Sequence, residues 1–313
     1  MRYLEETNKV KSDFLNFFKA NGYVLEPSVA LNSKIDPSVF VVGSCTNVFK
    51  PHLLNKDIAN TGHALVQPAI NSKKFPDFSS QDIKRFSSAY TNLGLLHKVE
   101  HLNDIVTNQY DFFTKIVGLD PAKLSITVNS NDKDFMNVLK PYKNLDIMDQ
   151  DACRNTFGKC GDFLLTGRNI RFNYNGNNIC VLSVYQDDKN ANLAVESSST
   201  IQIILTEKYS LKNTMCVSVL NDFYVAEKVN ELKYYDCIST ISEMLHSRIM
   251  PNSSHMDGRI LKRYIKAVMQ VHDKMNPKIQ NYAELIKFYT DSMYKGNNLP
   301  MDNIIQEAFD KCH

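Results

Sequence analysis

The sequence predicts an α+β fold, in which an antiparallel β-sheet flanked by helices is followed by an all-helical domain. Two observations carry this prediction. Short apolar runs bounded by Pro, Asn and Asp alternate with helical patterns through the first two thirds of the chain, and from about Asp236 onward the apolar spacing is almost entirely helical. Strands followed by a run of helices favour a sheet layer and a separate helical layer. We expect the boundary between residues 206 and 235 and place the two domains at 1–210 and 211–313.

Two helices are expected before the last third of the chain. Apolar residues recur at helical spacing over 10–18 and over 106–117, and Gly22 and Gly118 follow these two segments as stop signals. Both segments have one apolar face, which is typical of helices that pack on a sheet.

Several short stretches are expected to be strands. Apolar runs at 39–42 and 64–70 are separated by breakers, and residues 124–128 alternate between apolar and polar. Two further apolar stretches within 169–185 are joined by Asn175 and Gly176, which is a strong hairpin signal. Three helical stripes then follow, at 238–245, 261–268 and 285–293.

Composition limits the class of protein. The chain of 313 residues is 43% hydrophobic with a formal charge of +2, so it can fill a core but has little overall attraction for nucleic acid. No apolar run reaches about 18 residues and the N-terminus has no secretory pattern, so we expect no membrane segment and a cytoplasmic location. The seven scattered cysteines are expected to be reduced thiols, and no zinc site is expected.

Three segments carry a resemblance to a known family. Residues 14–28 (FLNFFKANGYVLEPS), 35–40 (IDPSVF) and 47–54 (NVFKPHLL) resemble the opening of alanyl-tRNA synthetases, without gaps over about 40 residues. The resemblance implies a class II synthetase-type sheet, and we expect a trimmed and diverged paralogue of the family's catalytic core. Its cofactors would be ATP and Mg²⁺, and its partners an amino acid and the acceptor stem of tRNA. A homodimer or a protein partner stays open.

The segment KRFSSAYTNLG, residues 84–94, resembles the family's second motif, ARHHTFFEMLG. The alignment places Arg85 on the catalytic arginine that holds the α-phosphate and the substrate carboxylate, a task that suits a planar, permanently charged guanidinium. It also assigns Thr91 and Gly94 to the ATP site, although Thr91 stands where the family has a glutamate. The alternative for Arg85 is an exposed loop arginine without a special role.

Residues 195–204 (VESSSTIQII) are the best counterpart of the third motif, VDTGMGLERL. Glu196 stands on the family's aspartate and is our candidate for binding the ammonium group of an amino acid. Ile203 stands where the family has an arginine, so that cation is missing. Glu196 could instead be an acid at a helix N-terminus, followed by capping serines. Upstream, Arg168 and Arg171 could replace some phosphate contacts or simply be solvated.

The segment 248–263 resembles a family pattern, GVLPSNEGRGYVLRR, from the part that binds tRNA. Its basic residues fall on one face of a helix expected to begin near Gly258, opposite an apolar face, and that arrangement is typical of contact with a phosphate backbone. Ordinary solvated charge is the alternative. The candidate RNA-binding residues are Arg248, Arg259, Lys262, Arg263 and Lys266.

Two functions remain open at this point. The first is an alanyl-tRNA synthetase-like ligase, which uses ATP to activate alanine or a similar amino acid as an aminoacyl-adenylate and transfers it to tRNA or another acceptor. The second is an inactive synthetase paralogue that binds tRNA or a protein. Arg85 and Glu196 favour the first function. Ile203, Thr91 and Asn71, which stands in a poorly matched segment, favour the second.

Overall fold

A computed structural model describes residues 2–71, 85, 87–148, 154–223, 229–272, 281–296 and 298–312. Within these ranges nine strands form one sheet in the order β1-β2-β3-β9-β8-β7-β4-β5, and β6 pairs with β7. The pairs β1–β2 and β4–β5 are parallel and the others are antiparallel. The strands are β1 (Val24–Leu25), β2 (His63–Ile70), β3 (Ala89–His97), β4 (Leu124–Asn129), β5 (Leu145–Met148), β6 (Arg154–Cys160), β7 (Phe163–Tyr174), β8 (Asn177–Gln186) and β9 (Asn192–Thr200).

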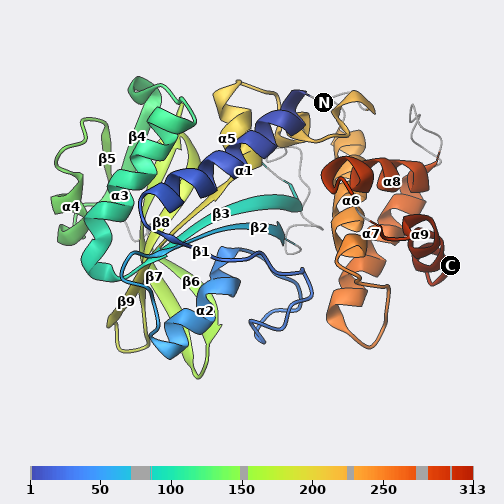
Figure 1. The fold of residues 1–313 in the computed structure, drawn as a ribbon, viewed down its shortest axis with the longest axis horizontal. Coiled ribbons are helices and arrows are strands. Elements are labelled where there is room, and N and C mark those ends of the chain that lie inside the picture. Colours follow the sequence, from blue (N-terminus) through green and yellow to red (C-terminus); the bar gives the residue numbers. More distant parts are fainter. Residues whose placement is uncertain are drawn as a thin grey trace.

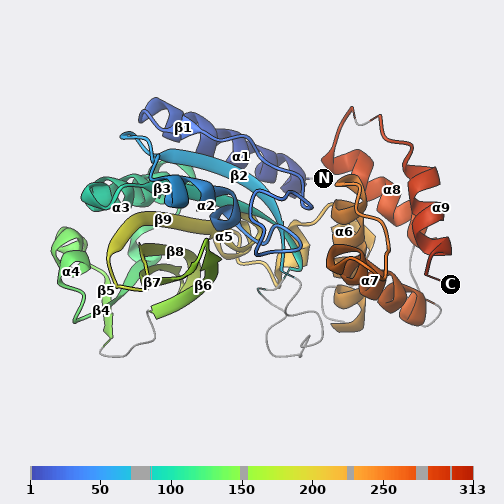
Figure 2. The same cartoon turned by 90° about the horizontal axis from the view of Figure 1, so that it is seen from below.

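Helices cover this sheet and continue beyond one end of it (Figures 1 and 2). Helices α1 and α3 pack on one face, α2 lies on the other, and α6 to α9 gather beside the sheet. None of the helices in the described ranges is both long enough and apolar enough for a membrane crossing. The α-helices are α1 (Arg2–Ala20), α2 (Cys45–Asn55), α3 (Leu102–Asp111), α4 (Lys133–Leu139), α5 (Ile201–Lys208), α6 (Val229–His246), α7 (Met256–His272), α8 (Tyr282–Met293) and α9 (Met301–Asp310).

Most of the predicted elements are confirmed. The predicted N-terminal helix is α1, and Gly22 follows it with a φ of +89°. The predicted hairpin is β7–β8, where Asn175 and Gly176 both have positive φ, as a two-residue turn of this kind requires. The three C-terminal stripes are α6, α7 and α8. The α+β fold is therefore as predicted.

The predicted strand at 39–42 is wrong, because this segment is irregular. Val42 makes isolated backbone bonds, donating from its N–H to the carbonyl of Leu31 and accepting from the N–H of Ile70, and no ladder forms. Val41 and Val42 are buried in the core. Their apolar character therefore reflects a loop packed beside α2 and not a strand.

Two clusters of buried side chains fill the protein. One joins α1 and α3 to the sheet through phenylalanines that include Phe14, Phe18 and Phe112. The other begins between α2 and the opposite sheet face and extends into α6, α7, α8 and α9. Because the second cluster includes residues on both sides of residue 210, the division into domains 1–210 and 211–313 stays a prediction.

Gly94 lets α2 approach the middle of the sheet. A Cβ atom at Gly94 would lie 2.3 Å from the Cβ and 2.6 Å from the Sγ of Cys45, and 3.0 Å from a ring carbon of Phe49. Both of these residues belong to α2 and are fully buried. The absence of a side chain at Gly94 therefore sets the distance between α2 and β3.

We expect Gly94→Ala to lower the free energy of unfolding by about 1–3 kcal/mol, because the added methyl group has no space in this packed core. Chemical denaturation followed by circular dichroism measures the effect. The matched control is Gly43→Ala, whose Cβ would meet its neighbours at ordinary contact distances of 3.6 Å. Equal stability of the two variants would contradict the role assigned to Gly94.

Candidate active site

The face of the sheet that α2 covers carries the candidate site. Strands β3 and β9 pair so that Asn92 faces Thr200, Gly94 faces Ser198 and Leu96 faces Glu196. Because side chains alternate along a strand, Glu196, Ser198 and Thr200 share one face. The N-terminus of α2 is fixed to this face, since the N–H of Cys45 donates to Oδ1 of Asn92 at 2.8 Å.

A pocket of about 230 Å³ opens at the Thr200 end of this face. It brings together Arg85, Asn71 and Ile203, which are far apart in the sequence and which the resemblance to synthetases assigns to the surroundings of ATP. Ile203 is thus close to where the family's third-motif arginine would be, but it offers no charge. The other lining residues are Ser87, Tyr90, Thr200, Gln202 and Thr214.

Arg85 is paired in this structure. Its Nε donates to Oε1 of Glu207 at 2.9 Å, and the other carboxylate oxygen, Oε2, accepts from Nδ2 of Asn177 at 2.7 Å. The Glu207 side chain is 5% exposed, whereas that of Arg85 is 35% exposed. The guanidinium is therefore held at Nε by a buried acid, and Arg85 lines a pocket that could hold an anion.

The other two residues assigned to the ATP site lie outside this pocket's lining. The backbone N–H of Thr91 donates to Oε1 of Gln202 at 3.0 Å, and the side chain of Thr91 is buried. Gly94 packs against Cys45 of α2, as described above. Since Thr91 and Gly94 are three residues apart on β3, they point to opposite faces of the sheet. One flat ligand cannot contact both positions on one face.

Glu196 lies in strand β9, so the alternative that it is an acid at a helix N-terminus is wrong: helix α5 begins only at Ile201. Its side chain is buried, with 2% exposure. The hydroxyl of Thr46 lies 3.0 and 2.9 Å from the two carboxylate oxygens and 3.1 Å from the hydroxyl of Tyr185. Because Thr46 has one proton, Tyr185 donates to Thr46 when Thr46 donates to Glu196.

Burial raises the pKa of Glu196 to about 8, and the hydrogen bond from Thr46 opposes only part of this shift. The carboxyl group is therefore mostly protonated at neutral pH in the ligand-free protein. An ammonium group placed beside it would favour the charged form and lower this pKa. Glu196 can therefore bind an ammonium group only if the cation reaches a site that is closed to solvent here.

Two serines, Ser87 and Ser88, anchor the chain beside Arg85. Ser87 Oγ donates to Oγ1 of Thr214 at 3.0 Å. The backbone N–H and the hydroxyl of Ser88 donate to the two carboxylate oxygens of Asp236 at 2.8 and 2.5 Å. Thr214, Asp236 and Glu207 were not identified from the sequence, because they lie more than 100 residues away and no motif marks them.

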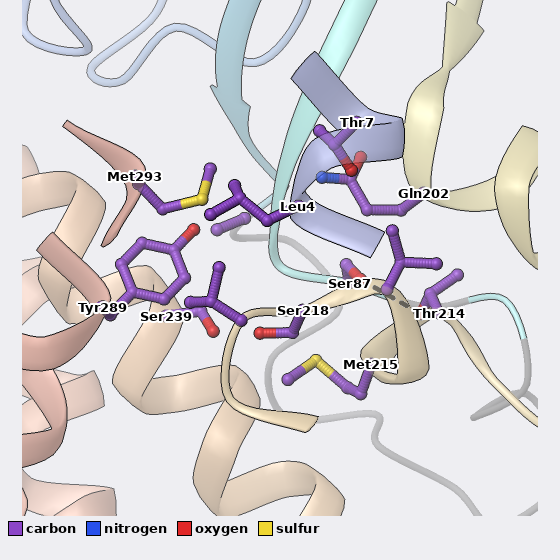
Figure 3. Close-up of a pocket in the computed structure, with 13 residues that line it drawn as sticks. Leu4, Thr7, Ser87, Gln202, Thr214, Met215, Ser218, Ser239, Tyr289 and Met293 are labelled. Carbon is purple, nitrogen blue, oxygen red and sulfur yellow. Dashed lines mark hydrogen bonds between the residues drawn. The ribbon is translucent and has the colours of Figure 1, made fainter. Parts of the chain in front are cut away.

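A second, smaller pocket lies behind the first, between α1, α5, the short turn η7 (Thr214–Val217), α6 and α8 (Figure 3). The two pockets share Ser87, Gln202 and Thr214 as a wall. Its volume of about 30 Å³ is suited to a water molecule and not to a substrate. Leu4 and Met293 close its other side.

The basic residues on α7 are accessible. Arg259, Arg263 and Lys266 are exposed and Lys262 is half-buried, and the apolar residues of this helix lie in the core. Arg248 is exposed as well, in the turn after α6. The structure thus has the one-sided basic face that the sequence predicts, while its binding to RNA stays a prediction.

Arg168 points to the opposite face of the sheet from Glu196, because it pairs with Val184, which in turn pairs with Val195. Its guanidinium donates to Asp132 at 3.0 Å and to both carboxylate oxygens of Asp134, at 2.9 and 2.7 Å, and it lies over the ring of Phe135. These contacts connect β7 to α4 and give Arg168 a structural role. Arg171 is half-buried, three residues further along the same strand.

One group of side chains has the composition of a metal site. Single ligand atoms of Glu26, His52 and His63 lie within 4.8 Å of one another. However, Nε2 of His63 accepts a hydrogen bond from the N–H of Ala59 at 2.9 Å, so the proton of the neutral ring is on Nδ1, which faces Glu26 at 2.7 Å. A protonated nitrogen has no lone pair for a metal. Both ring nitrogens of His63 are therefore used in hydrogen bonds, to Ala59 and to Glu26.

Comparison with known proteins agrees with the resemblance noted in the sequence. No protein-family profile matches the chain. The alanine–tRNA ligase of Latilactobacillus sakei subsp. sakei (strain 23K) is 28% identical over 130 residues, which are 40% of this chain and 15% of that protein. This chain therefore corresponds to only a small part of the curated relative.

Two solved synthetase structures align with about two thirds of this chain, at low similarity. Pyrrolysyl-tRNA synthetase from Desulfitobacterium hafniense covers 68% of this chain and 73% of its own, with 4% identity and a TM-score of 0.42. Aspartyl-tRNA synthetase from Entamoeba histolytica covers 69% of this chain and 57% of its own, with 10% identity and a TM-score of 0.43. Over 40% of its length, the chain is a distant homologue of alanine–tRNA ligase.

Proposed function

We propose that this protein is an alanyl-tRNA synthetase-like ligase that activates an amino acid with ATP. The observation that supports the proposal is the pocket in which Asn71, Arg85 and Ile203 meet, at one end of the sheet face that carries Glu196. A phosphate group in this pocket would take the donors of Arg85, and the guanidinium geometry suits such an anion. The amino acid would lie toward Glu196, and the acyl group would pass to tRNA or another acceptor.

The residues fit the expected substrates in part. Arg85 offers a cation for ATP, and Glu207, once released by Arg85, is an acid that would hold Mg²⁺. Mg²⁺ supplies charge neutralisation for the phosphates. The described residues that line the pocket include one cation, Arg85, whereas adenylation benefits from positive charge at both ends of the triphosphate. Weak ATP binding is the expected consequence.

A second function has its own support. Ile203 in the pocket and the buried, mostly neutral Glu196 both favour an inactive paralogue that binds tRNA or a protein. The basic face of α7 serves either function, since an acceptor stem would contact it in both. Amino-acid-dependent exchange of pyrophosphate into ATP, measured with all twenty amino acids, distinguishes the two functions.

Arg85→Ala should weaken ATP binding by on the order of 2–3 kcal/mol, the contribution of a charge-assisted contact. In the absence of Mg²⁺, Glu207→Gln should have the opposite effect, because it removes the carboxylate that competes with phosphate for Arg85. Titration calorimetry measures both affinities. Equal ATP binding by the wild type and Arg85→Ala would exclude Arg85 as the phosphate ligand, and no binding by either would favour the inactive paralogue.

Glu196→Gln tests the amino-acid site. If Glu196 receives an ammonium group, the variant should lose thermal stabilisation by the amino acid and keep stabilisation by ATP. The variant should also change the pH dependence of stability. Since folding raises the pKa of Glu196 from 4.5 to about 8, its contribution to wild-type stability is lost as pH rises through this window, and Gln should remove that loss.

Thermal unfolding of both proteins between pH 4.5 and 9 measures this difference, and subtraction isolates Glu196 from other titrating groups. A difference in stability that does not vary with pH would contradict the raised pKa. An unchanged thermal shift with amino acid in the variant would leave Glu196 a purely structural residue.

Reversing charge on α7 tests RNA binding. The double variant Lys262→Glu, Arg263→Glu should bind an acceptor-stem minihelix more weakly and with a flatter salt dependence than the wild type. Contact with about three phosphates predicts a log–log salt slope of about −3 for the wild type. Fluorescence anisotropy at several salt concentrations gives both quantities.

The matched control is Lys9→Glu, Lys115→Glu, which makes the same change in charge at side chains that are 64% and 67% exposed on the other part of the protein. If this control weakens binding as much as the α7 variant, the effect is one of net charge only. If the α7 variant binds like the wild type, the RNA site is elsewhere or absent.

A further inference from the structure

Asp236 is a buried acid that the proposed chemistry does not use. It lies in α6 and is 2% exposed. Both of its carboxylate oxygens accept hydrogen bonds from one residue, Ser88, through the backbone N–H at 2.8 Å and the hydroxyl at 2.5 Å. A buried carboxylate is costly unless it is hydrogen-bonded, so this pair is a specific contact between α6 and the start of β3.

Ser88 lies between Arg85 and the start of β3, so its contact with Asp236 bears on the pocket. Ser88 follows Arg85 by three residues and immediately precedes β3, which begins at Ala89. On the neighbouring residue, the hydroxyl of Ser87 donates to Thr214 of η7. The chain that carries Arg85 is therefore held on one side by η7 and on the other by α6, next to the pocket.

Among the residues that the structure describes, no cationic side chain contacts the carboxylate of Asp236. Burial raises its pKa to about 6, and the two bonds from Ser88 oppose the shift. The described titratable groups that interact with it include Tyr264 of α7, Tyr289 of α8 and Cys237 of α6, and burial raises the pKa of all three. These three groups are thus neutral at physiological pH. The ionised carboxylate of Asp236 is stabilised by the two hydrogen bonds from Ser88.

We propose that Asp236 is the positioning residue for Arg85: by holding Ser88 it fixes the start of β3 and thereby the direction in which Arg85 enters the pocket. The helical part of the chain thus contributes to the phosphate pocket without touching the ligand. The effect of Asp236 on ATP binding through Arg85 rests on the proposed function. The anchoring of Ser88 by Asp236 does not.

Hydrogen–deuterium exchange tests the anchoring directly, because the N–H of Ser88 is one of the two donors. In Asp236→Ala, amides of residues 88–92 should exchange at least about tenfold faster, since a bond to a charged acceptor is lost. In Asp236→Asn they should remain protected, because the amide oxygen accepts from the Ser88 N–H and the amide nitrogen donates to its hydroxyl.

The matched control is Ser239→Ala, one turn further along α6, whose buried hydroxyl donates within its own helix, to the carbonyl of Tyr235 at 3.0 Å. It should leave exchange in 88–92 unchanged. If Asp236→Ala does not fold, Ser88→Ala removes the hydroxyl bond alone and should give a smaller increase. Unchanged exchange in the folded Asp236 or Ser88 variants would overturn the anchoring.

Pyrophosphate exchange then tests the consequence for Arg85. Asp236→Ala should raise KM for ATP about tenfold and leave KM for the amino acid unchanged, and Asp236→Asn should restore ATP binding. General destabilisation would raise both constants and would not be rescued. A wild type that binds no ATP would overturn the proposed function and the catalytic meaning of Asp236, while the exchange result still decides whether Asp236 holds the chain.

Discussion

The close packing of α2 on the middle of the sheet determines what the rest of this face can do. Gly94 leaves the space that Cys45 fills, Asn92 accepts from the first amide of α2, and Thr46 reaches Glu196. These contacts remove the centre of the face from solvent. They leave an open pocket at the Thr200 end, around Arg85, whereas Glu196 at the other end is buried.

The two ends of the face therefore differ in their electrostatics. At the open end a guanidinium is held by a buried acid, so an incoming anion competes with Glu207 for a cation that is already oriented. At the closed end burial keeps a carboxyl group mostly neutral near pH 7. A substrate with an ammonium group and a phosphate would have to displace an ion pair at one end and ionise an acid at the other, and both steps reduce affinity.

The sequence predicted those parts of the structure that depend on local periodicity. Helices α6, α7 and α8 have clear apolar stripes, and Asn175–Gly176 specifies the β7–β8 turn. The strand predicted at 39–42 was wrong because an apolar loop packed beside a helix has the same composition as a strand. The secondary structure at Glu196 could not be predicted because the serines after it suit both a helix cap and a strand. In the structure this segment is a strand that pairs with β3 and β8.

The partners of the site could not be predicted for a different reason. Asp236 and Ser88 are 148 residues apart, and Glu207 and Arg85 are 122 apart, so no spacing in the sequence indicates either contact. Only the packing of α6 and α5 against the start of β3 brings them together. This also explains why serine is suited to positions 87 and 88: a short hydroxyl fits between β3 and the adjacent helices, where it bonds Thr214 or Asp236. The hydroxyl groups of Ser87 and Ser88 are thus matched by acceptors elsewhere in the same chain. A segment that had merely lost its function would not need two such acceptors, and their presence favours a retained, ordered position for Arg85.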